Sequence, residues 1–221
     1  MFLRNKLLLC ILGIALCAPV FADTDANHDK ETKTDIAAGA AEKPKSNIFF
    51  GDKQNQVSFT LGQGFDSGEL ILFLHMDRPA PYYMLNFSYS QPTTFFRLPA
   101  RQTINLVKTI GFGSSDYDGK CGYRKACNWE DYGAEIFMLS EDFALYHTTR
   151  WYFGAGGGVA VQGRYNERLN TKFLLGFRMF AGYKFSEYWA TEFVMQHFSN
   201  GDTGTRNLVY DFYGLSAVYS F

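Results

Sequence analysis

The chain has 221 residues, which suits one domain with or without short appendages. Its formal net charge is −1, so the composition gives no reason to expect a nucleic acid as a partner. Aromatic residues make up 18% of the chain, with 22 Phe and 14 Tyr, and Gly is common at 21. Because mean hydropathy is only −0.17, this composition favours many alternating strands over apolar helices.

The N-terminus predicts a secretory signal peptide over residues 1–22. Two cations supply a positive start, residues 7–16 form a short apolar run, and residues 20–22 (VFA) form a cleavage site. The apolar run is too short for a comfortable transmembrane helix, and no other stretch holds ~20 uninterrupted apolar residues. A membrane anchor and lipidation at Cys17 are the weaker alternatives, since no small residue precedes that cysteine.

Residues 23–52 are polar, charged and rich in Ala, and they lack strand periodicity, which predicts a flexible extension. From residue 53 the chain changes to alternating runs of about ten residues with turn residues between them. Residues 53–221 therefore predict an all-β fold, an eight-stranded antiparallel transmembrane β-barrel of the outer-membrane type. The expected strands cover residues 55–63, 81–91, 102–113, 131–139, 149–162, 171–185, 188–199 and 207–221.

An apolar run at residues 69–76 either extends the first hairpin or lies in its loop, so the strand count carries an uncertainty of one. Eight is the smallest usual number for a closed membrane barrel, and side chains fill the lumen of such a barrel. In residues 173–185 one face is lipid-like, whereas the other mixes Gly with Arg178 and Lys184, as a narrow polar lumen would. The Gly run at residues 154–158 suits the same crowded lumen and lacks the pattern of a nucleotide-binding loop.

Periodicity alone does not separate a membrane barrel from a soluble sandwich that buries its apolar face. The expected segments are long enough for tilted membrane spans. Aromatic pairs at segment ends, such as Tyr82-Tyr83 and Tyr188-Trp189, are typical of interfacial girdles. The final Phe221 closes an alternating strand, which resembles the terminal signature of bacterial outer-membrane proteins. These three features favour the membrane barrel.

Connections in such a barrel alternate between the two sides of the membrane, and the longer ones usually face outside. The expected outer connections lie near residues 64–80, 114–130, 163–170 and 200–206. The expected periplasmic connections lie near residues 92–101, 140–148 and 186–187, of which the first is long for an inner turn.

Cys121 and Cys127 are the cysteines that remain once the signal peptide is removed. In an oxidising compartment they predict a disulfide that clips the loop between them. A metal site is the alternative, but two thiols without a nearby His make an incomplete ligand set.

Three polar residues share the expected lipid face of the last two strands. His197 and Ser199 are two positions apart in one strand, so they lie on one face about 7 Å apart, together with Phe193. A hairpin centred near residue 204 would place Asp211 opposite His197. Polar groups on an oily surface are costly, which favours a functional site. The alternative is that all three lie in the headgroup zone and merely face water.

These residue types in this arrangement suit nucleophilic hydrolysis of an ester. Ser199 is a weak nucleophile alone, but the histidine can accept its proton, and the aspartate can orient the imidazole and stabilise the imidazolium. Attack on an acyl ester produces a tetrahedral oxyanion. Asn207 and the backbone around Asn200 and Gly201 lie close to the serine in sequence and could donate hydrogen bonds to that oxyanion.

The HFSNG stretch at residues 197–201, followed by Asn207 and Asp211, resembles the PagL family of lipid A 3-O-deacylases. In that family a His-x-Ser-Asn motif precedes an Asn and then an acidic residue, at the spacing seen here from position 199 to positions 207 and 211. Asp211 departs from the glutamate of the family pattern and is one methylene shorter. The N-terminal extension and the Cys121–Cys127 loop are additional features of this chain.

The resemblance implies an eight-stranded barrel in the bacterial outer membrane. Its implied reaction is hydrolysis of the ester-linked 3-hydroxyacyl chain at the 3-position of lipid A, without metal or cofactor. Lipid A of lipopolysaccharide would approach laterally from the outer leaflet, so a triad of His197, Ser199 and Asp211 that faces lipid is reasonable. The expected partners are lipid A and the outer membrane, with no nucleic acid, and a homodimer stays open.

Two other functions fit the same barrel. One is a non-catalytic adhesin or scaffold, for which the informative part would be the loop at residues 114–130. The other is a different lipid-modifying enzyme, either a phospholipase or an acyltransferase. The His-x-Ser-Asn spacing favours the deacylase over both.

Overall fold

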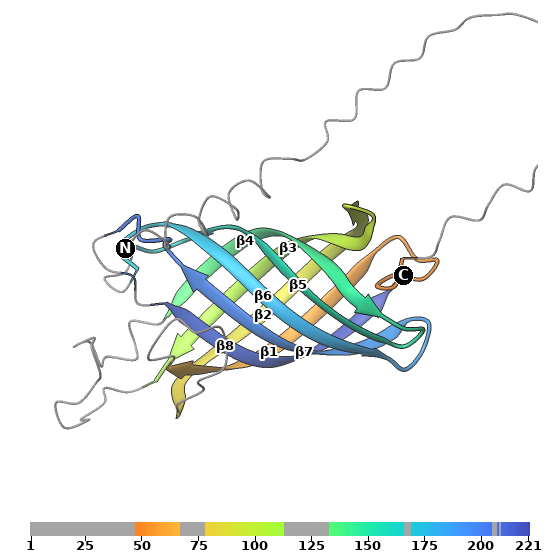
Figure 1. Ribbon diagram of the computed structural model, residues 1–221. Coiled ribbons are helices and arrows are strands. Elements are labelled where there is room, and N and C mark those ends of the chain that lie inside the picture. Colours follow the sequence, from red (N-terminus) through yellow and green to blue (C-terminus); the bar gives the residue numbers. More distant parts are fainter. Residues whose placement is uncertain (1–46, 67–77, 113–132, 166–168, 205–206, 208) are drawn as a thin grey trace, which may run out of the picture. The chain divides into compact units, whose positions relative to one another are not determined.

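The computed structural model describes residues 47–66, 78–112, 133–165, 169–204, 207 and 209–221. These residues form eight antiparallel strands, and β1 pairs with β8 to close a barrel (Figure 1), which confirms the expected all-β architecture. No helix among these residues is long and apolar enough to cross a membrane. The strands are β1 (Gln56–Asp66), β2 (Arg78–Phe95), β3 (Leu98–Gly111), β4 (Ala134–His147), β5 (Trp151–Gln162), β6 (Phe173–Lys184), β7 (Trp189–Ser199) and β8 (Tyr210–Ser220).

Each expected strand overlaps one observed strand, but two connections are shorter than expected. Residues 92–101 are strand except for a turn at Phe96 and Arg97, whose φ angles of 45° and 69° suit a two-residue hairpin turn. Likewise, β4 continues through the expected connection at residues 140–148 as far as His147. The pairing with the neighbouring strands continues through both stretches.

The connections β2–β3, β4–β5 and β6–β7 lie at one end of the barrel, together with the first described residues and the C-terminus (Figure 1). We call this the short-turn end, and we call the opposite end, where β7 stops and β8 begins, the loop end. Short turns on one side and longer connections on the other are typical of outer-membrane barrels, in which the longer connections are extracellular.

The outer surface of the barrel is apolar. Along β3 and β4, buried and exposed side chains alternate, and the exposed set is largely hydrophobic. Exposed side chains on the strands include Phe59, Leu61, Phe87, Leu106, Phe137, Val161, Phe193 and Leu215. A soluble sandwich would bury such a face, so this surface is suited to lipid.

Of the aromatic pairs expected at the strand ends, Tyr188 and Trp189 are both exposed, whereas the pairs Tyr82-Tyr83 and Trp151-Tyr152 divide between the two faces. Tyr82 and Tyr152 lie in the lumen, with exposed fractions of 1% and 2%. Their neighbours Tyr83 and Trp151 point outward, because successive side chains of a strand alternate. At the short-turn end, Trp151 packs on Tyr183 with ring centroids 4.6 Å apart, as in an interfacial girdle.

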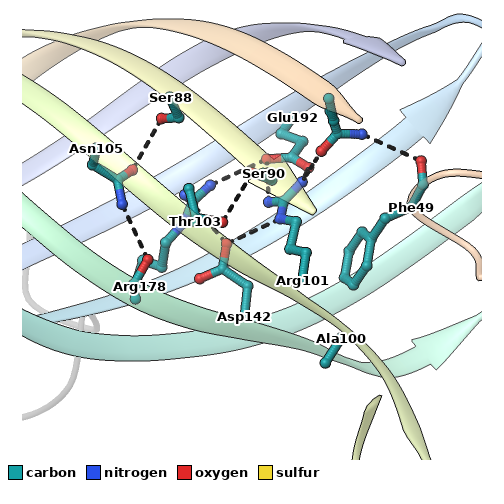
Figure 2. Close-up of polar contacts among 12 residues, drawn as sticks. Phe49, Ser88, Ser90, Ala100, Arg101, Thr103, Asn105, Asp142, Arg178 and Glu192 are labelled. Atoms are coloured by element: carbon teal, nitrogen blue, oxygen red, sulfur yellow. Dashed lines mark hydrogen bonds and ion pairs between the residues drawn. The ribbon is translucent and has the colours of Figure 1, made fainter. Parts of the chain in front are cut away.

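A cluster of buried charges occupies the lumen (Figure 2). Arg101 donates to both carboxylate oxygens of Glu192 at 2.7 and 3.0 Å and to Asp142 at 3.0 Å. Arg178 lies 3.3 Å from Asp142 and 3.2 Å from Glu192. Two guanidinium groups therefore face two carboxylates, so Arg178, one of the two cations expected in the lumen, is neutralised there. Lys184, the other, donates to the carbonyl of Ile48 at 3.2 Å. The hydroxyl of Tyr152 adds a hydrogen bond of 2.8 Å to Glu192.

The end of the expected flexible extension packs into the barrel instead. The side-chain amide of Asn47 donates to a β3 carbonyl at 2.9 Å. Phe49 and Phe50 are 1% and 0% exposed, and the guanidinium of Arg101 lies 4.6 Å from the centroid of the Phe49 ring (Figure 2). The extension was expected to reach residue 52. Phe49 and Phe50 instead bury apolar surface at the short-turn end, and this burial holds the chain in place there.

Several expectations fall outside the described residues. They are the signal peptide at residues 1–22, the rest of the extension at residues 23–46, the apolar run at residues 69–76 and the disulfide between Cys121 and Cys127. All four stay predictions from the sequence.

Because the lumen carboxylates are buried and paired, removing one should lower the free energy of unfolding far more than removing an exposed carboxylate. Glu192→Leu leaves two buried guanidinium groups with Asp142 alone, and breaking a buried pair costs about 3–5 kcal/mol of unfolding free energy. Glu135→Gln, in the exposed pair with Lys108, should cost less than about 1 kcal/mol. Urea unfolding of both variants in detergent micelles measures the difference, and equal losses would contradict the role of the cluster.

Candidate active site

The predicted site residues lie together at the loop end of the barrel. His197 and Ser199 are at the end of β7, and Asp211 is the second residue of β8. Gln196 and Phe198 are buried at 3% and 0% exposure on the lumen side, so the alternate residues between and beside them point outward. Strand alternation therefore places all three predicted residues on the outer, apolar face.

His197 and Asp211 are direct cross-strand partners, as the hairpin centre near residue 204 predicts. The Nδ1 of His197 lies 2.6 Å from Oδ1 of Asp211. An aspartate therefore reaches the imidazole although it is one methylene shorter than a glutamate. With its Nδ1–H donated to the carboxylate, a neutral imidazole keeps the lone pair on Nε2 and can accept a proton there.

Apolar side chains enclose this pair. Phe177 lies opposite His197 on β6, and Phe65 lies opposite Asp211 on β1. Phe65 is 2% exposed and stacks on Tyr213 with ring centroids 5.7 Å apart. The side chains of the pair are consequently only 19% and 5% exposed. Excluding water lowers the local dielectric constant, which strengthens the hydrogen bond between the imidazole and the carboxylate.

Ser199 shares the outer face with His197 and lies opposite Leu175 on β6. Among the described residues, the hydrogen bond of the His197 ring goes to Asp211 and not to Ser199. Two positions along a strand separate the serine from the histidine by about 7 Å between Cα atoms. Hydrogen bonds between a nucleophile and its base are often long without substrate, so this spacing is compatible with a catalytic pair.

The chain turns sharply after Ser199, at residues 200–203. The N–H of Thr203 donates to the carbonyl of Asn200 at 3.2 Å, and Gly201 and Asp202 both have φ of 62°, as a tight hairpin turn requires. Asn200 is fully buried and holds the turn with its side chain. Its amide donates to the carbonyl of Leu169 at 2.5 Å, and its oxygen accepts from the Asp202 N–H at 2.9 Å.

Two of the predicted oxyanion donors are engaged within this turn. The N–H of Asn200 donates to Oδ1 of Asn207 at 3.1 Å. The side-chain amide of Asn207 donates to Asp202 at 3.0 Å. Asn200 and Asn207 therefore brace the turn in the observed arrangement.

Gly201 differs from these two residues. A Cβ atom at position 201 would lie 3.0 Å from Leu175, the residue directly opposite Ser199, so Gly201 lies beside the serine. Within the described part of the chain, its N–H has no hydrogen-bond acceptor. Of the predicted donors, Gly201 is thus the one that is free to meet a ligand.

The sequence pattern does not reveal the supports of the site. Leu169 lies in an expected outer loop, and only the folded barrel brings its carbonyl to Asn200. Phe65 also lies in an expected loop, and its place beside Asp211 depends on the pairing of the first and last strands. The described residues hold no group of three or more His, Cys, Asp or Glu that could bind a metal ion.

A sequence model of one protein family, described as Lipid A 3-O-deacylase (PagL), matches residues 43–220. No curated protein matches the chain. The crystal structure of the outer membrane enzyme PagL is 15% identical, covers 75% of this chain and 99% of its own, and has a TM-score of 0.48. The backbone structure of the Yersinia pestis outer membrane protein Ail, in a phospholipid bilayer nanodisc, is 12% identical, covers 77% and 100%, and has a TM-score of 0.45.

The role of Asn200 predicts a local effect of Asn200→Ala on the turn. Losing the bond to a buried side chain costs about 1–3 kcal/mol, so the Asp202 amide should exchange with solvent roughly tenfold faster or more. Amide hydrogen exchange by NMR in micelles measures this, with the Phe193 amide in the middle of β7 as the internal control. An unchanged rate at Asp202, or an equal rise at Phe193, would contradict the bracing role.

Proposed function

The chain belongs to the PagL family of lipid A 3-O-deacylases, and from this membership we propose that it hydrolyses the ester-linked 3-hydroxyacyl chain at the 3-position of lipid A. Membership makes it a hydrolase of the bacterial outer membrane. The observation that carries the proposal is the contact of 2.6 Å between His197 and Asp211 on the outer face, two positions from Ser199. Polar groups on a surface that faces lipid cost free energy, so their presence there indicates a function.

In the proposed mechanism, Oγ of Ser199 attacks the ester carbonyl while Nε2 of His197 takes its proton. Asp211 holds the imidazole in the required tautomer and stabilises the imidazolium. The tetrahedral intermediate collapses, and the histidine returns the proton to the departing 3-oxygen of the sugar. Water, activated by the same histidine, then hydrolyses the acyl-serine and releases the 3-hydroxy fatty acid.

The oxyanion of each tetrahedral intermediate needs a donor in place before reaction. We assign that role to the Gly201 N–H, because it lies beside Ser199 and has no acceptor among the described residues. Asn200 and Asn207 support this donor by holding the turn. This division of roles refines the expectation that all three contact the substrate.

The substrate would reach the site from the membrane. Ser199 faces outward at the loop end, and the longer connections of outer-membrane barrels are extracellular, so the site opens toward the outer leaflet. Leu175 and Phe177 on β6 lie directly opposite the serine and the histidine and offer an apolar surface to the acyl chain. The proposed partner is therefore lipid A itself; nothing in the comparisons supports a homodimer.

Lipid A composition tests the proposed reaction. Expression of the native chain in an outer membrane should remove one 3-hydroxyacyl mass from lipid A, and Ser199→Ala should abolish the change because no nucleophile remains. Mass spectrometry of extracted lipid A measures both. Ser58→Ala, on β1 and away from the site, is the matched control and should behave as the native chain. Unchanged lipid A beside a folded native barrel would refute the deacylase.

The acid is tested by two substitutions at position 211. Asp211→Ala should leave the barrel folded but lower the initial rate on the order of 10²–10⁴-fold, because the base loses its orientation. Asp211→Glu restores a carboxylate and should recover a measurable part of that rate. Initial rates on purified lipid A in mixed micelles give the comparison. Full activity of Asp211→Ala would show that Asp211 is not the orienting acid.

A further inference from the structure

Asp211 stands close to the end of its strand, since β8 begins at Tyr210. Strand ends open locally more easily than strand centres, so a residue there keeps a fixed position only if other contacts hold it. The contact with His197 is between side chains and does not anchor the backbone of β8. Pairing with Phe65 of β1 and His197 of β7 holds this backbone within the sheet, and a further anchor comes from the lumen, on the opposite face.

The anchor is Tyr82 of β2. It is 1% exposed, and its hydroxyl lies 2.6 Å from the carbonyl oxygen of Phe65 on β1 and 3.1 Å from that of Asp211 on β8. The single hydroxyl proton is thus shared between two carbonyls on neighbouring strands. The ring also packs edge-on against Phe212, with centroids 5.2 Å apart. Tyr82 therefore ties the start of β8 to β1.

Two features of β1 allow the ring to reach β8. A Cβ atom at Gly64 would lie 2.2 Å from the Tyr82 ring, so a residue without a side chain is required where the ring crosses. The register of β1 and β2 also shifts between Gln63 and Phe65, and Phe65 then faces Pro79, which has no N–H to donate. The Tyr82 hydroxyl supplies a donor to the Phe65 carbonyl at this irregularity.

We propose that Tyr82 is a positioning residue for the reaction proposed above, acting through the backbone of Asp211 to hold its carboxylate against His197. The inference rests on the proposed function. The contacts of the Tyr82 hydroxyl with Phe65 and Asp211 do not depend on that function. Tyr82 lies in the lumen and Asp211 points to the outer face, so the tyrosine does not touch the substrate. Its effect passes from the hydroxyl to the Asp211 carbonyl and from there to the carboxylate.

The lumen offers a matched control in Tyr152. It is also a buried tyrosine, 2% exposed, and its hydroxyl donates to Glu192 at 2.8 Å. It stands near the short-turn end of β5, whereas the site is at the loop end. Tyr152→Phe removes one buried hydroxyl just as Tyr82→Phe does, so loss of stability alone would affect both variants.

The experiment compares Tyr82→Phe and Tyr152→Phe in the full chain in micelles. Tyr82→Phe should lower kcat for lipid A roughly 10- to 100-fold with KM unchanged, because a small displacement of an orienting group has an effect of that size. It should also shift the Nδ1 proton resonance of His197 in a ¹⁵N-labelled sample. Tyr152→Phe should leave both kcat and that resonance as in the native chain.

Equal effects in both variants would reduce Tyr82 to a general support of the barrel, and no effect of Tyr82→Phe would refute the inference. If Tyr82→Phe does not fold, 3-fluorotyrosine at position 82 changes the donor strength of the hydroxyl with little change of shape. An unshifted His197 resonance in that protein also refutes the inference. If the native chain does not hydrolyse lipid A, the proposed function fails, whereas the resonance still tests the anchor.

Discussion

The buried charge cluster fixes the register on which the rest of the barrel depends. Arg101, Asp142, Arg178 and Glu192 come from β3, β4, β6 and β7, and their bonds form only if each strand presents that side chain inward. A slip of one residue in a strand exchanges its two faces and would place a charge in lipid. The same register turns His197 outward, so the polar lumen and the outward-facing site are two results of one constraint.

Local alternation is strong enough in this sequence to predict the barrel, the faces of its strands and the pairing of His197 with Asp211. The pairing followed from the centre of a single hairpin, which involves only neighbouring strands. Contacts between distant segments were out of reach, such as the Tyr82 hydroxyl on β8 and the packing of Phe49 into the lumen. Tyr82 was grouped with Tyr83 because adjacent aromatics suggest a girdle, although alternation sends them to opposite faces.

The surroundings of the proposed site suit an imidazole and a carboxylate that act together on a surface facing lipid. Phe65 and Phe177 flank the pair and keep water away from it, which strengthens the hydrogen bond that orients the base. The proposed oxyanion donor, Gly201, lies instead on a turn held by Asn200. Strand pairing thus fixes the proposed base and acid, and a hydrogen-bonded turn presents the proposed donor beside Ser199.

Covalent capture of the nucleophile is the sharpest test of the proposed outward-facing triad, in which Oγ of Ser199 is the reacting atom. A lipophilic fluorophosphonate added to the folded barrel in micelles, followed by peptide mass spectrometry, locates the labelled residue. We expect a phosphonyl adduct on Ser199 that disappears when His197 is replaced by Ala. A folded native barrel that carries no adduct, or that carries it on another residue, would show that Ser199 is not the nucleophile of an outward-facing triad.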